Sequence, residues 1–307
     1  MRSNRLLWCA WLILALALGI GCAQKSESSA GEPAVARAGP PIVVTTIEVN
    51  RYLAARIGGA RVDVRSPVPP EADPLGWEPT RDTIAVFQDA DLVILNGAGL
   101  EGWRDRVTLR PSSTITLADA YAAEWLTFSG TVEHQHGPEG SHSHSGTDPH
   151  IWFDPQLVKK HATQITEALA TRFPEHAAEF RVRGSEVETD LDDLDQRFRS
   201  PEGKTLPPLL ANHPAYDYAA RRFGWSIENH TLDPEQVVTP DVAAVASTGR
   251  NVLLWESPPA AAVRAAFEAA GITSVVVSPC EQPPASGDWL SVMQENAQRI
   301  RALARDP

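Results

Sequence analysis

Cysteine and basic side chains are scarce in this 307-residue sequence. It contains 27 Lys and Arg against 39 Asp and Glu, for a formal net charge of −12. No basic stripe appears that could neutralise phosphates, so the composition argues against nucleic acid as a partner. The acidic balance suits a soluble protein, or one that handles cations. The length predicts about two domains, with a core large enough to be stable without disulfides.

The three cysteines do not support an internal disulfide framework. Cys9 lies in an almost continuous apolar run, residues 6–20, which follows two arginines. Residues 1–22 read as a secretory signal, too short and wrongly flanked for a stable membrane span, although an uncleaved anchor is the alternative. Cys22 ends this segment. Cys280 is then left without a partner cysteine.

The residues around Cys22 resemble a bacterial lipoprotein signal. Gly-Ile-Gly precedes the cysteine and the polar run AQKSESSAGEP follows it, although Gly19 stands where an aliphatic residue is usual. The resemblance implies that Cys22 becomes a lipid anchor to the membrane and that the protein is extracytoplasmic, in the periplasm or at the cell surface. Residues 23–41 are rich in Ser, Ala, Gly and Pro, which predicts a disordered tether.

Apolar, β-branched segments alternate with helical patterns along both halves of the remaining chain. This order predicts an α/β fold of two lobes, each a parallel sheet flanked by helices. We expect an N-terminal lobe over 42–154 with a Gly-, Ser- and His-rich loop at 129–147. One long, rigid helix over 155–184 then leads to a C-terminal lobe over 185–307. Ligands of such sheets lie beyond the carboxyl ends of the strands, which here means the cleft between the lobes.

Two histidines and one glutamate lie in loops that should open toward this cleft. His150 and His213 each follow an apolar segment, beside Asp-Pro or Pro turns, and Glu281 lies in the loop after the last strand. Neutral imidazole and carboxylate oxygen are usual zinc ligands. A hydrogen-bonded loop histidine, with no metal, is the alternative for each position.

Six segments between residues 42 and 305 follow one another in a recognisable order. They are PPEADPLGWEPT, DLVILNGAGLEGW, the His-rich loop, DPHIWFDP, NHPAYDYAARRFG and SGDWLSVMQENAQRI. In this order they resemble the cluster A-I solute-binding proteins, the metal-binding lipoproteins of bacterial zinc and manganese ABC importers. The resemblance implies a monomeric, non-enzymatic receptor that captures Zn²⁺, with Mn²⁺ as the alternative, and passes it to an ABC permease.

Carried over by position, the resemblance implies metal ligands at His150, His213 and Glu281. Ser278 and Cys280 are the other positions on which the carboxylate ligand of the family could fall. Where the family usually has its first histidine, this chain has Leu75, which cannot bind a metal. Asp73, Glu78, a loop histidine or water could fill that place. Glu256 is a further candidate, as a ligand or as a hydrogen-bond partner of a ligand. A set of two histidines and a carboxylate favours zinc over manganese.

Five of the nine histidines fall within residues 134–150. His150 should be fixed by its Asp-Pro turn, whereas the other four are clustered in the loop. The resemblance implies that the loop collects metal at low affinity, and a solvated, pH-sensitive linker is the alternative. The loop histidines are His134, His136, His142 and His144.

Two other functions remain open at this stage. Leu75 allows a scaffold that has lost its metal site and acts as an adhesin, or binds another solute. Three protein ligands plus water would also suit a zinc hydrolase, but the sequence has no HExxH motif and no evident general base beside the ligands. We further expect His161 and His176 to be surface residues of the long helix. Asp154 and Asp217 are possible partners of the ligating histidines, but we expect each to be a solvated turn residue.

Overall fold

The computed structural model describes residues 39–128, 132–135, 141–144 and 146–307. The predicted signal, Cys22 with its lipid anchor, and all but the last residues of the predicted tether therefore lie outside the described residues, as does His136. Within the described ranges, no helix is both long and apolar enough to cross a membrane.

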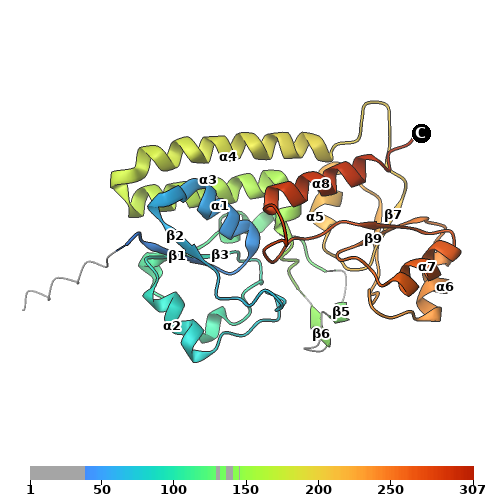
Figure 1. Ribbon diagram of the computed structural model, residues 1–307, viewed down its shortest axis with the longest axis horizontal. Coiled ribbons are helices and arrows are strands. Elements are labelled where there is room, and N and C mark those ends of the chain that lie inside the picture. Colours follow the sequence, from blue (N-terminus) through green and yellow to red (C-terminus); the bar gives the residue numbers. More distant parts are fainter. Residues whose placement is uncertain (1–38, 129–131, 136–140, 145) are drawn as a thin grey trace, which may run out of the picture. The chain divides into compact units, whose positions relative to one another are not determined.

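Two separate four-stranded sheets, both entirely parallel, form the framework and confirm the predicted two-lobe α/β fold (Figure 1). Each strand is only three or four residues long, and the connections between neighbours carry the helices. The first sheet has the order β2 (Asp63–Arg65), β1 (Ile42–Thr45), β3 (Leu92–Leu95) and β4 (Thr114–Thr116). The second has the order β10 (Thr273–Val276), β9 (Val252–Trp255), β7 (Leu209–Ala211) and β8 (Ile227–Asn229).

The central strands of the first sheet are apolar on both faces. Alternate residues point to opposite faces of a strand, so Val43 and Ile94 join the main core beneath α1 (Glu48–Gly58). Val44 and Val93 instead pack with Phe87 of α2 (Arg81–Asp89). A run without polar alternation, such as IVVT in β1, is therefore what a parallel strand covered on both sides requires.

The second sheet repeats this arrangement. Leu209 and Leu254 face the main core, whereas Leu210 and Trp255 face a smaller cluster with α7 (Ala261–Ala269). The lobe also contains α5 (Asp217–Phe223), α6 (Thr239–Ser247), which begins at a Thr-Pro pair, and α8 (Trp289–Arg301).

The single helix expected over 155–184 is two helices. α3 (Pro155–Arg172) ends before Pro174, a short 3-10 turn follows, and α4 (Ala177–Phe198) continues. Pro174 lacks a backbone N–H and its ring disfavours a helical conformation for the preceding residue. The helical pattern on both sides of Pro174 concealed this break. α3 and α4 lie side by side (Figure 1).

The loop expected at 129–147 contains regular structure. β5 (Val132–Gln135) and β6 (Ser141–His144) pair as an antiparallel hairpin. An isolated bridge between Thr127 and Thr147 closes its base. The strands VEHQ and SHSH lack the alternating apolar pattern that would have predicted them.

Candidate metal centre

His150 is a buried histidine that a carboxylate holds in place. Its Nδ1 lies 2.7 Å from Oδ1 of Asp148, and the same oxygen accepts the backbone N–H of His150 at 2.9 Å. Both residues are buried. Desolvation by burial lowers the pKa of His150. The carboxylates of Asp148 and Glu281 raise it by more than burial lowers it, so that the pKa is about 10. With Nδ1 on a carboxylate, Nε2 is the nitrogen left to face the cleft.

The segment that carries His150 is fixed from several sides. The backbone N–H of Asp148 donates to Leu126, and the hydroxyl of Tyr218 in α5 donates to the carbonyl of Asp148. Asn96, after β3, donates to the carbonyl of Pro149. The expectation that His150 directly follows an apolar strand was wrong, since the polar hairpin precedes it. A short 3-10 helix (Ile151–Phe153) follows and buries its three side chains in the core.

His213 comes from the other lobe and meets His150 directly. It follows β7 after Asn212, and its side chain is buried. The Nε2 atoms of His213 and His150 are 3.4 Å apart, and the rings are edge to face. The structure therefore brings together two histidines that lie 63 residues apart in the sequence.

Glu281 completes a convergent trio. Its Oε1 lies 3.5 Å from Nε2 of His150, and its side chain is one quarter exposed. It also lines a cavity of about 320 Å³ together with Glu256 of the loop after β9. The strands that precede His213, Glu256 and Glu281 are neighbours in the second sheet, so their loops meet at its carboxyl edge.

The distances around Nε2 of His150 match those of a zinc site in part. Tetrahedral zinc with bonds of about 2.0–2.1 Å places its ligand atoms about 3.3–3.4 Å apart. The pairs His150–His213 and His150–Glu281 stand at 3.4 and 3.5 Å. However, within the described ranges no three His, Cys, Asp or Glu residues are arranged so that they could hold a metal ion as they stand. Two sides of the ligand triangle thus have the required length.

The first loop supplies no histidine. Leu75 is partly buried against the main core, and its backbone N–H donates to Oδ1 of Asp73 at 2.9 Å. Asp73 therefore shapes the turn at this position. Glu78 forms an exposed ion pair with Arg106, which provides it with a partner away from the histidines.

The remaining ligand candidates have other contacts. The Nδ2 atom of Asn212 lies 3.5 Å from Oε1 of Glu256, and the backbone N–H of Glu256 donates to Oδ1 of Asn212. The hydroxyl of Ser278 accepts the backbone N–H of Cys280. The thiol of Cys280 is buried, and burial raises its pKa to about 12, so it stays protonated in the metal-free protein. Glu281 is the one of the three positions 278, 280 and 281 that contacts His150.

The carboxylate on Nδ1 of His150 is Asp148, a residue that the sequence interpretation had not singled out as its partner. Asp154 caps α3 through the backbone N–H of Gln156, and Asp217 accepts from Asn229. The signal for Asp148 was present in the Asp-Pro-His turn.

His161, expected at the surface, is fully buried. Its Nδ1 faces Oδ1 of Asn50 at 3.2 Å, and its Nε2 contacts the hydroxyl of Tyr121. His176 is partly exposed, as its side chain retains 26% of its accessible area. His161 lies on the apolar stripe of α3 with Val158 and Ile165, so helical periodicity was a signal for its burial that the expectation overlooked.

The hairpin places three of the loop histidines by register. His134 is directly opposite His142, and His144 is opposite Val132.

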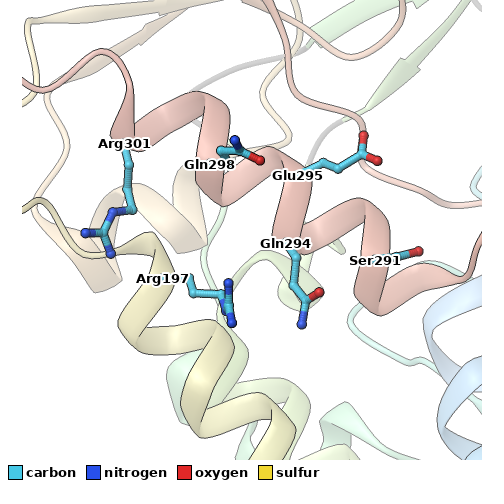
Figure 2. A pocket seen from close by; sticks show the side chains of 6 residues that line it. All are labelled: Arg197, Ser291, Gln294, Glu295, Gln298 and Arg301. Atoms are coloured by element: carbon cyan, nitrogen blue, oxygen red, sulfur yellow. The ribbon is translucent and has the colours of Figure 1, made fainter.

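A separate polar cavity of about 490 Å³ lies between α4 and α8 (Figure 2). Its lining contains no histidine and none of the predicted ligands, and comprises Arg197, Ser291, Gln294, Glu295, Gln298 and Arg301. It has no part in the site around His150.

The chain belongs to the ZnuA family, described as "Zinc-uptake complex component A periplasmic", whose match covers residues 43–303. This confirms the class that the sequence motifs indicated, a solute-binding protein rather than an enzyme. The family description names a periplasmic component of a zinc-uptake complex, and the chain spans 65% of the length of the first relative below.

Relatives and solved structures agree with this family. The chain is 28% identical over 216 residues to the high-affinity zinc uptake system protein ZnuA of Bacillus subtilis, a match of 66% of this chain and 65% of that protein. It is 25% identical to the zinc-binding protein TroA of Treponema pallidum, over 70% and 68% of the two chains. The metal-dependent lipoprotein YcdH of B. subtilis has the same fold, with a TM-score of 0.74 at 20% identity, over 86% of this chain and all of that one.

Proposed function

We propose that this protein captures zinc outside the cytoplasm and delivers it to an ABC importer. The observation that carries the proposal is the convergence of His213 and Glu281 on Nε2 of His150, at distances close to the edges of a tetrahedral zinc site. The names of the relatives, a zinc uptake protein and a zinc-binding protein, support zinc as the solute.

The proposed ligands are His150, His213 and Glu281. Leu75 offers no ligand, so water takes the fourth position in this proposal, as in other zinc sites with three protein ligands. Glu256, in the same cavity as Glu281, acts as a nearby negative charge and not as a ligand.

The ligand types select zinc over manganese. Two imidazoles and one carboxylate are nitrogen-rich, and manganese prefers a site with more oxygen ligands. Asp148 adds to this preference, because a carboxylate on Nδ1 raises the basicity of the ligating Nε2.

We further propose that the receptor is monomeric and reaches its ABC permease from a lipid anchor on Cys22. The apolar run before Cys22 and the polar residues after it support this anchor. The loop histidines His134, His136, His142 and His144 would collect metal at low affinity.

Calorimetric titrations with zinc and with manganese test the proposed function. We expect one tight zinc site per chain, lost in the variant His213→Ala, and at least about 100-fold weaker manganese binding at neutral pH. If the wild-type protein binds neither metal tightly, the cleft has lost its metal, and a scaffold that acts as an adhesin or binds another solute replaces this proposal.

A further inference from the structure

The segment Pro279–Gln282 belongs to the C-terminal lobe but is bonded to the N-terminal lobe. The indole N–H of Trp152 donates to the carbonyl of Pro279 at 2.9 Å. The backbone N–H of Glu48, in the first turn of α1, donates to the carbonyl of Glu281 at 3.0 Å. Glu281 is therefore held by elements of the lobe that also carries His150.

A third bond reaches the loop at 69–76, which carries Leu75. The side-chain amide of Gln282 donates to the carbonyl of Ala72 at 2.7 Å. This bond joins residues 210 positions apart, and both partners are half-buried. It is the shortest of the three bonds and the only one of them made by a side chain of the ligand loop itself.

Two further hydrogen bonds lie within the loop at 69–76. The backbone N–H of Ala72 donates to Pro69, and that of Leu75 donates to Asp73. Leu75 packs against the core, but it cannot bind a metal. A bound metal therefore cannot join this loop to Glu281 through position 75, whereas the bond from Gln282 to Ala72 joins the loop to the ligand segment directly.

From these contacts we propose that Gln282 is a positioning residue. Its hydrogen bond to Ala72 connects the loop at 69–76 to the ligand segment. The loop and Glu281 are therefore held in position in the metal-free protein. The metal then gains a preorganised site. The inference rests on the proposed function, because it assigns Gln282 a role in the site of Glu281.

Hydrogen exchange of the metal-free protein, followed peptide by peptide, tests this role. The variant Gln282→Met keeps the length of the side chain and removes the donor. We expect exchange across 69–76 to quicken about fivefold, as the loss of one hydrogen bond permits. In the wild-type protein, zinc should leave exchange of this loop unchanged, because the loop is already fastened.

The matched control is Gln298→Met, at an exposed position of α8. It should leave exchange at 69–76 as in the wild type, and both variants should unfold at the wild-type temperature. A general loss of structure would lower that temperature, whereas a positioning role would not. The zinc dissociation rate should rise in Gln282→Met alone.

Two outcomes would overturn the inference: slow exchange at 69–76 in Gln282→Met, or a loop that becomes protected in the wild type only when zinc is added. Zinc titrations of the same samples separate this failure from that of the proposed function. A protein that binds zinc tightly while its loop depends on zinc refutes the role of Gln282 alone. A protein that binds no zinc refutes the receptor.

Discussion

At the scale of single residues, His150 and Asp148 form a buried pair at 2.7 Å. The carboxylate fixes the ring and leaves Nε2 for a metal. The other oxygen of Asp148, Oδ2, is buried without a hydrogen-bond partner among the described residues. A buried carboxylate kept in this state is costly, which indicates that its interaction with His150 is valuable to the protein.

The variant Asp148→Asn should weaken zinc binding about 10- to 100-fold, the usual effect of removing the carboxylate partner of a ligating histidine. Calorimetric titration at pH 7.5 measures this change. The matched control is Asp193→Asn, because Asp193 is exposed on α4 and pairs with Arg197, and it should bind zinc like the wild type. Equal affinities of Asp148→Asn and the wild type would show that Asp148 does not support the site.

The buried His161 makes stability depend on pH. Burial lowers the pKa of His161 from 6.5 to about 3, so the folded protein keeps this ring neutral. Below pH 6.5 the unfolded chain binds a proton that the folded chain does not. The free energy of unfolding should therefore fall with decreasing pH, by up to ~1.4 kcal/mol per unit between pH 6.5 and 3.

Urea unfolding of the metal-free protein at several values between pH 7 and pH 4.5 measures this slope. The variant His161→Gln should lose most of the contribution. The control His176→Gln, at a partly exposed histidine, should retain it. A pH profile that is the same for His161→Gln and the wild type would contradict the account.

At the scale of elements, α3 and α4 approach closely where Gly184 faces Thr166. A methyl group at Gly184 would lie 2.3 Å from Oγ1 of Thr166. The variant Gly184→Ala should therefore destabilise the protein by about 1–3 kcal/mol, as overpacking does. Denaturant titration measures this loss.

A second substitution separates the clash from helix propensity. Thr166→Ala removes the obstructing atoms, so the double variant should recover part of the stability lost in Gly184→Ala. Val182→Ala, at a position of α4 that is 61% exposed, serves as the control and should change stability little. A Gly184→Ala variant as stable as the wild type would mean that the helices can move apart there without cost.

Sequence patterns predicted most elements because the physical signals are local. The β-branched run of β1 and the Thr-Pro start of α6 each depend on neighbours in the chain. The break at Pro174 could have been predicted from the proline alone, but the matching periodicity on both sides masked it. The hairpin at 132–144 could not have been predicted in this way, because its residues have low strand propensity. Its base is closed by the bridge between Thr127 and Thr147, a contact between residues distant in the chain.

At the scale of the whole molecule, the site depends on contacts between distant segments. The motifs predicted His150, His213 and Glu281, and the fold brings these three together. Their distances could not be read from the sequence, and neither could the burial of His161 against Asn50, 111 residues away. Long-range packing decides such contacts, and one sequence carries no direct signal for them.

The most direct test of the central claim is a zinc titration of residues 39–307, which form one compact unit. In this protein the four loop histidines, His134, His136, His142 and His144, are changed to Ser so that the loop keeps its length. We predict that one tight zinc per chain remains and that a further His213→Ala substitution abolishes it. Zinc binding that disappears with the loop histidines, leaving no tight site at His150, His213 and Glu281, would contradict the account.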